Sequence, residues 1–178
     1  YQQRLRIPLP PHHAAIYGSA LHAAVAEFHR GQMNGAAPEL PALTAALDRS
    51  WQSAGFVSRS HEEARRDAAL KVIERFRGEE LASGVVPAYV EKDFSFEIGG
   101  HKVRGRWDRV DVQALPPEGR SAPIPTIDVP GDVVRPTLPL GDDEWVVVSD
   151  YKTGKVPDSR FGANKMDNMH IYASLCLR

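Results

Sequence analysis

Residues 145–154 read WVVVSDYKTG, and they indicate the fold more clearly than any other stretch of the chain. Their apolar half is short, rich in β-branched residues and bounded by polar residues, which predicts a buried central strand. Side chains two positions apart share one face of a strand, so Asp150 and Lys152 would project together. Burying the carboxylate of Asp150 at the end of this strand is costly unless Lys152 or a metal ion neutralises its charge. Taken alone, this Asp-x-Lys triplet is better explained as an ion pair at a strand end.

The segments before this strand are first helical and then extended in pattern. Apolar spacing predicts helices over residues 15–30, 43–54 and 61–81, with Gly55 ending the second. Residues 89–98 and 101–112 alternate around Gly99 and Gly100, which predicts a β-hairpin. The order of elements indicates an α/β (α+β) protein with a small sheet.

The segment from 113 to 144 differs in composition from the rest. It holds seven of the fourteen prolines, with six acidic residues and two arginines. We interpret it as a proline-rich loop or small β-excursion inserted into one domain that spans residues 1–178. A final helix is predicted from about Lys165.

Composition excludes several classes of protein. The 178 residues are 42% hydrophobic and 25% charged, which is ordinary for one globular domain. No apolar run approaches the roughly 20 residues that span a bilayer. The single cysteine, Cys176, excludes a disulfide framework and a cysteine-zinc site and suggests a reducing compartment, so we expect a cytoplasmic protein. A net charge of −1 argues against nucleic-acid binding through bulk positive charge, although not against a local grip on a few phosphates.

Two further stretches carry candidate metal ligands. Residues 105–112 read GRWDRVDV, so Asp108 lies on a predicted strand that could neighbour Asp150. Two carboxylates with Lys152 beside them suit a hard divalent cation, while charge pairing across a surface hairpin explains them as well. On the first predicted helix, Gly18 lies one turn before His22 and leaves the surface above it open. Such a histidine is usually a boundary residue, and it becomes a ligand candidate where other ligands converge on it.

The convergence itself resembles a known family. A histidine on a helix (Gly18 to His22), an acid on a hairpin (105–111) and Asp-x-Lys on a strand (150–155) follow the order of the PD-(D/E)XK nuclease superfamily. More narrowly, the chain resembles the RecB/AddB-like nuclease domains at the C-termini of UvrD-like helicases, whose "DYKTG" signature is similar to residues 150–154. The resemblance runs from the first helix to the end of the chain, without the insertion. It implies a restriction-endonuclease-like core, in which helices flank a small mixed β-sheet.

The resemblance also implies an activity. The chain would be a divalent-metal-dependent DNA nuclease, an exonuclease rather than an endonuclease, acting on single-stranded DNA delivered by a helicase in repair or recombination. Mg²⁺, or Mn²⁺, would be held by His22, Asp108, Asp150 and the carbonyl of Tyr151. Lys152 would orient the attacking water and stabilise charge on the phosphate. Relatives with an iron–sulfur cluster use four cysteines, so the one cysteine here implies no such cluster in this segment.

The remaining site candidates have weaker support. Glu91 is a residue that holds a metal ligand in place, a ligand for a second metal or a plain surface acid. Tyr172 and Asn168 would contact DNA, with Asn168 standing where the family usually has glutamine. Possible phosphate contacts, for which a solvated role is as good an explanation, are Arg106, Lys155 and Arg160. Asp108 and Asp150 are 42 positions apart, which exceeds the usual spacing in the family.

Three other interpretations compete with the nuclease. An inactive nuclease-fold lobe would bind DNA or act as a scaffold, although all four core residues are present. A P-loop is excluded because it needs glycine at position 149 and Ser or Thr at position 156, where this chain has Ser149 and Val156. A structural domain with chance charges would show no dependence on metal. Because the chain begins without methionine and stops within an apolar run, we expect it to be part of a longer helicase-nuclease, which would also explain its near-neutral charge.

Overall fold

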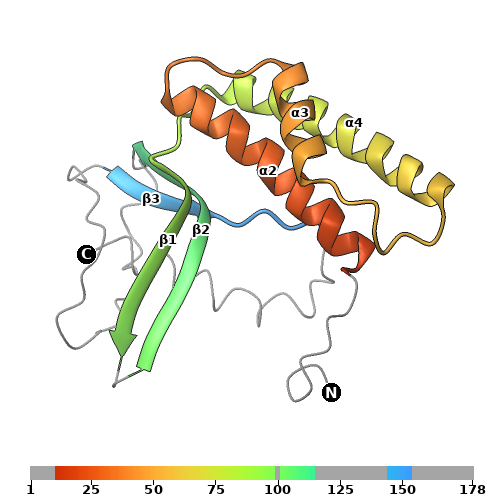
Figure 1. Cartoon of the computed structure of the whole chain (residues 1–178). Helices are drawn as coiled ribbons and strands as arrows, with labels where there is room; N and C mark the ends of the chain where they lie inside the picture. The colour runs from red at the N-terminus through yellow and green to blue at the C-terminus, as the bar shows by residue number, and fades with distance from the viewer. Residues whose placement is uncertain (1–10, 99–100, 115–143, 154–178) are drawn as a thin grey trace, which may run out of the picture. The chain divides into compact units, whose positions relative to one another are not determined.

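The computed structural model describes residues 11–98, 101–114 and 144–153. They form three helices followed by three strands, in the order α2, α3, α4, β1, β2 and β3 (Figure 1). They divide into a helical unit, residues 11–85 with 152–153, and a sheet unit, the described residues between 86 and 151. The α/β class predicted from the sequence is confirmed. The helix predicted from Lys165 lies outside the described residues.

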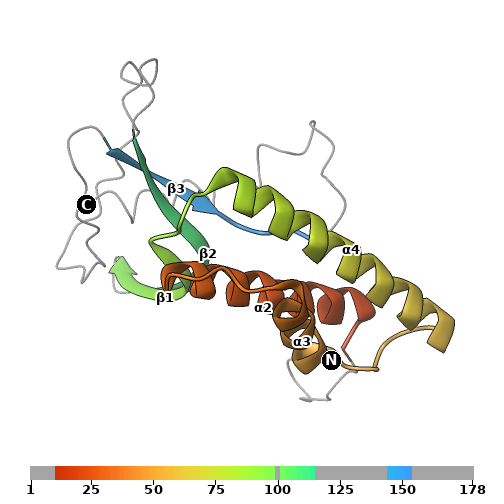
Figure 2. The same cartoon turned by 90° about the horizontal axis from the view of Figure 1, so that it is seen from above.

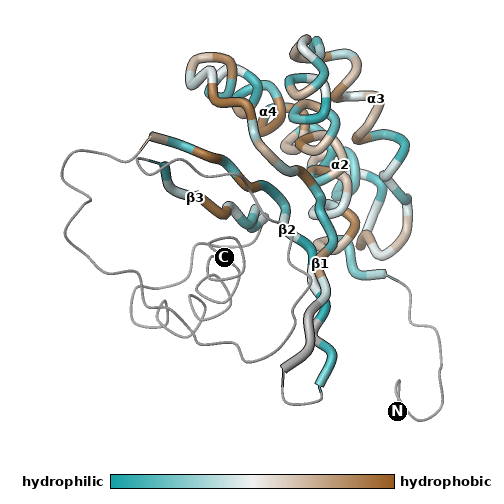
Figure 3. The backbone as a smooth tube through the Cα atoms, turned by 90° about the vertical axis from the view of Figure 1, so that its left-hand side faces the viewer, coloured by the Kyte–Doolittle hydropathy of each residue, from teal (hydrophilic) through white to brown (hydrophobic). Residues whose placement is uncertain are grey.

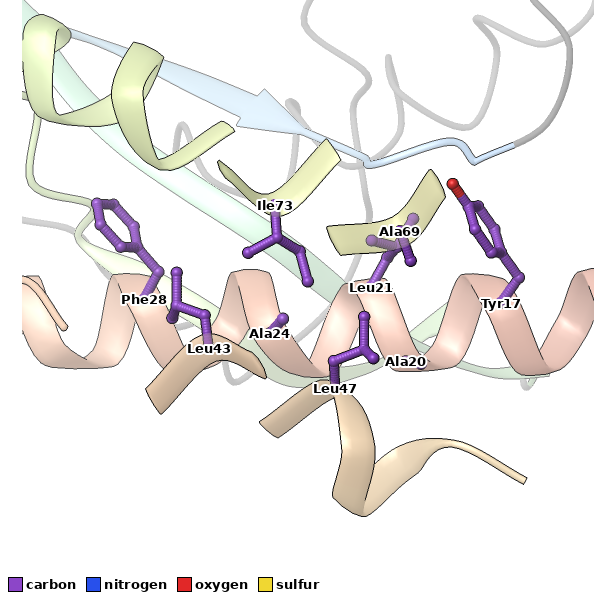
Figure 4. Close-up of a cluster of buried hydrophobic side chains, with 9 residues drawn as sticks. All are labelled: Tyr17, Ala20, Leu21, Ala24, Phe28, Leu43, Leu47, Ala69 and Ile73. Atoms are coloured by element: carbon purple, nitrogen blue, oxygen red, sulfur yellow. The ribbon is translucent and has the colours of Figure 1, made fainter. Parts of the chain in front are cut away.

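Three helices make up the helical unit: α2 (His13–Met33), α3 (Leu40–Ser50) and α4 (Arg59–Ser83). The first of them, α2, packs against both of the others (Figure 2). Its apolar face buries Leu21 and Phe28 against side chains of α3 and α4 (Figure 4). None of the helices in the described part of the chain is long and apolar enough to cross a membrane.

The second helix ends earlier than the sequence predicts. It stops at Ser50 rather than Ala54, because Trp51 leaves the helix in an extended conformation. The Trp51 indole donates a 3.0 Å hydrogen bond to Oε1 of Glu62 and stacks on Phe56, with ring centroids 5.5 Å apart. Packing against the start of α4 therefore ends α3 before Gly55.

The sheet unit contains β1 (Tyr89–Ile98), β2 (His101–Ala114) and β3 (Glu144–Ser149), paired in that order. Both pairings are antiparallel, and Ile98 pairs with His101, so the predicted hairpin is confirmed. Ala114 pairs with Glu144, so the strands continue into the segment interpreted as an insertion. Its residues 115–143 lie outside the described residues.

The strand predicted to be central and buried lies instead at the edge of the described sheet. Among the described strands, β3 pairs with β2 alone and lies beside it (Figure 3). Its apolar stretch is half-buried, and Trp145 is 36% exposed. The middle strand is β2, which supplies the buried Trp107 and Val110. A polar-flanked apolar run does not reveal how many neighbours a strand has, and within the described sheet β3 has one neighbour and is half-buried.

Candidate functional site

Glu91 on β1 and Asp108 on β2 face each other across the hairpin. The pairs on either side, Val90 with Arg109 and Lys92 with Trp107, place Glu91 directly opposite Asp108. Both side chains are half-buried, and each offers a carboxylate oxygen within 4.8 Å of the other. Because like charges directly opposite each other destabilise a sheet, the pair is an arrangement that a cation would stabilise.

The backbone is unusual at this point of β1. Among the residues that the structure describes, Glu91 is the only non-glycine residue with a positive φ, of 47°. A residue in the left-handed region costs about 1–3 kcal/mol, and such residues cluster at functional sites. The strain therefore coincides with the acidic pair.

Arg106 compensates part of this negative charge. Its Nη1 donates to Oε2 of Glu91 at 3.3 Å, while Nε and Nη2 donate to the Asp93 carboxylate at 2.6 and 3.1 Å. These hydrogen bonds hold the pKa of Asp93 below its ordinary value. Arg106, predicted as a phosphate contact, thus already contacts two acids of the same hairpin.

Asp108 is held from the other side by the segment that follows β3. The backbone N–H of Tyr151 donates to Oδ2 of Asp108 at 2.8 Å. Arg109 pairs with Ser149, the last residue of β3, and the half-buried Asp150 comes directly after it. Asp150 does not, however, complete a group of three with Glu91 and Asp108 within 4.8 Å. The sheet unit thus contains the three acids Glu91, Asp108 and Asp150, of which Glu91 and Asp108 lie close together.

The other two predicted catalytic residues, His22 and Lys152, belong to the helical unit. His22 is half-buried on α2, and Lys152 is exposed. A Cβ added at the buried Gly18 would lie 3.0 Å from Oγ1 of Thr153. Gly18 on α2 therefore leaves room for Thr153, the residue after Lys152. From the sequence, Gly18 was expected only to leave the helix surface open.

Glu91 is closer to the proposed site than its sequence position alone indicates. Its side chain is 17% exposed, so it is half-buried rather than fully exposed on the surface. The predicted hairpin could have indicated this position of Glu91. A two-residue turn at Gly99 and Gly100 implies the register in which Glu91 lies opposite Asp108. The predicted residues outside the described part of the chain are Lys155, Arg160, Asn168 and Tyr172.

The contact at Gly18 gives a matched prediction within the helical unit. Gly78 on α4 has no atom within 4 Å of an added Cβ, so Gly78→Ala should stabilise the protein by about 0.5–1 kcal/mol through helix propensity. Gly18→Ala should gain little or nothing, since Thr153 must move away. Urea denaturation measures both effects. An equal gain from the two substitutions would contradict the role assigned to Gly18.

These features define an α/β protein with a carboxylate-rich site suited to a hard divalent cation. A comparison with protein families matches residues 1–122 to the PD-(D/E)XK nuclease superfamily, and the chain belongs to that superfamily. The matched range contains His22, Glu91 and Asp108 and ends before Asp150. Searches of curated proteins and of solved structures gave no significant match.

Proposed function

We propose that the chain is a divalent-metal-dependent deoxyribonuclease that hydrolyses phosphodiester bonds. The observation that carries this proposal is the half-buried, like-charged pair of Glu91 and Asp108 in a chain of the PD-(D/E)XK nuclease superfamily. Two carboxylates this close repel each other across the hairpin, and a bound divalent cation would replace that repulsion by attraction to both.

The donor set suits Mg²⁺ or Mn²⁺, which prefer carboxylate and carbonyl oxygens. Asp108 and Asp150 are the proposed carboxylate ligands, joined by His22 from α2 and the carbonyl oxygen of Tyr151. The location of Glu91 opposite Asp108 adds it to this set. When bound, the cation would lower the pKa of a water molecule that it coordinates and would stabilise negative charge on the phosphate.

Lys152 is the proposed catalytic cation contributed by the chain itself. Its ammonium group would donate hydrogen bonds to the attacking water and to the phosphate oxygen on which charge develops. Asp150, two residues earlier, would stand on the same side of the extended segment. The resemblance of residues 150–154 to the signature of RecB/AddB-like domains supports these roles.

The charges of β2 support contact with a nucleic-acid backbone. Lys102, Arg104 and Arg106 occupy every second position before Asp108, so they share its side of a regular strand. Successive members are separated by about 6.8 Å along the strand. Phosphate contacts through such side chains position a substrate without reading its sequence. Lys155, Asn168 and Tyr172 remain proposed DNA contacts.

The finer assignment follows the RecB/AddB resemblance. We propose exonucleolytic action on single-stranded DNA that an attached helicase delivers during repair or recombination. A net charge of −1 fits this arrangement, because a motor that feeds the strand raises its local concentration without a large basic groove. The second candidate is an inactive DNA-binding or scaffolding lobe, which Asn168 in place of the usual glutamine favours.

Cleavage of labelled single- and double-stranded DNA tests the proposal, with Mg²⁺, Mn²⁺ or EDTA present. We expect cleavage with either metal, none with EDTA, and a loss in Asp150→Ala and Lys152→Ala. Matched controls on the exposed face of α4 are Asp67→Ala and Lys71→Ala, which should retain activity. Calorimetric Mn²⁺ binding without cleavage would favour the inactive lobe. Absence of both would contradict any metal-dependent function.

A further inference from the structure

A buried ion pair lies next to the proposed site and has no part in the mechanism above. Arg109 and Asp111 on β2 are 6% and 3% exposed. Nε of Arg109 donates to both carboxylate oxygens of Asp111, at 2.8 and 2.9 Å. Replacing a buried ion pair by apolar residues of similar size is often neutral or stabilising. Stability alone therefore does not account for this pair.

The pair contacts the proposed site through Tyr151. Nη1 of Arg109 donates a long hydrogen bond, of 3.4 Å, to the Tyr151 hydroxyl. The backbone N–H of the same tyrosine donates to Oδ2 of Asp108 at 2.8 Å. Tyr151 is therefore held at its side chain by Arg109, while its backbone holds the carboxylate of Asp108.

We propose that Arg109, held in one orientation by Asp111, is a positioning residue for Asp108. It acts by fixing the Tyr151 hydroxyl, which restrains the backbone of residue 151 and so the direction in which its N–H points. Two hydrogen bonds from one nitrogen to Asp111 limit the rotation of the Arg109 side chain, so the restraint starts from a rigid group. The consequence for metal affinity rests on the proposed function, whereas the restraint of residue 151 does not.

Removing the tyrosine hydroxyl tests this chain of contacts with little risk to folding. Tyr151→Phe keeps the ring and deletes the acceptor that Arg109 uses. Tyr89→Phe is the matched control, because Tyr89 stacks on Trp107 with ring centroids 6.5 Å apart and loses only its hydroxyl. Two readouts apply to the full chain: amide hydrogen exchange of residue 151 measured by NMR without metal, and Mn²⁺ affinity measured by calorimetry.

We expect exchange at residue 151 to become at least about tenfold faster in Tyr151→Phe and to stay unchanged in Tyr89→Phe. Loss of a group that hydrogen-bonds to a metal ligand and orients it typically weakens metal affinity 10–100-fold. We therefore expect Mn²⁺ binding to weaken by a factor in this range. Arg109→Gln should speed exchange similarly, and combining it with Tyr151→Phe should add nothing further.

The outcomes separate this inference from the proposed function. Unchanged exchange at residue 151 overturns the inference. So does unchanged Mn²⁺ affinity in Tyr151→Phe when the wild-type chain binds Mn²⁺ and Asp108→Asn does not. If the wild-type chain binds no Mn²⁺ but exchange still accelerates in Tyr151→Phe, the restraint of residue 151 is supported and the metal-dependent function fails.

Discussion

Asp108→Asn should reduce metal-dependent cleavage by at least about 10³-fold, the scale typical for loss of an essential catalytic group. The substitution removes one carboxylate of the pair that Asp108 forms with Glu91, whose carboxylate oxygens lie within 4.8 Å of each other. It also removes the charge that a divalent cation would neutralise, so the variant should lose Mn²⁺ binding with its activity.

The same substitution should not destabilise the metal-free protein. Asparagine relieves the repulsion with Glu91, and its amide oxygen can still accept the hydrogen bond from the Tyr151 N–H. Thermal unfolding with and without Mn²⁺ measures both effects: the metal should raise Tm of the wild type and leave that of the variant unchanged. Asp67→Asn on α4 controls for loss of an exposed acid. Undiminished cleavage by Asp108→Asn would remove this residue from the site.

Trp107→Ala should cause the largest loss of stability in the sheet unit, about 3–5 kcal/mol, because it empties a buried aromatic site. Trp107 is 1% exposed and contacts Phe94, with ring centroids 4.9 Å apart. Trp145→Ala is the matched control. Its indole is 36% exposed at the sheet edge, so its loss should cost far less.

A second variant separates packing from hydrogen bonding at this position. The Trp107 indole Nε1 is buried without a hydrogen-bond partner among the described residues, so its N–H adds nothing to stability. Trp107→Phe should therefore cost much less than Trp107→Ala, with the remaining loss due to reduced volume. Urea denaturation followed by circular dichroism compares the three variants. Equal losses for Trp107→Ala and Trp145→Ala would contradict the assigned core.

Local sequence patterns were enough to locate most of the helices and strands of this protein. Apolar spacing located α2 and α4 to within two or three residues, and alternation around Gly99 and Gly100 located the hairpin. These patterns are local because a helical or extended period is set by neighbouring residues. Asp108 and Asp150 were also identified as acids of one candidate site from sequence order, together with the family resemblance.

Three other features became visible only in the folded chain. Stacking of Trp51 on Phe56 ends α3 before its sequence pattern does. Strand order puts β3 at the edge of the described sheet, because an apolar run does not specify its neighbours. Arg109 reaches the site through Tyr151, 42 positions later in the chain. The ring stack joins residues five positions apart across a loop, and the other two features depend on contacts between residues far apart in sequence. No helical or extended periodicity of side chains encodes any of them.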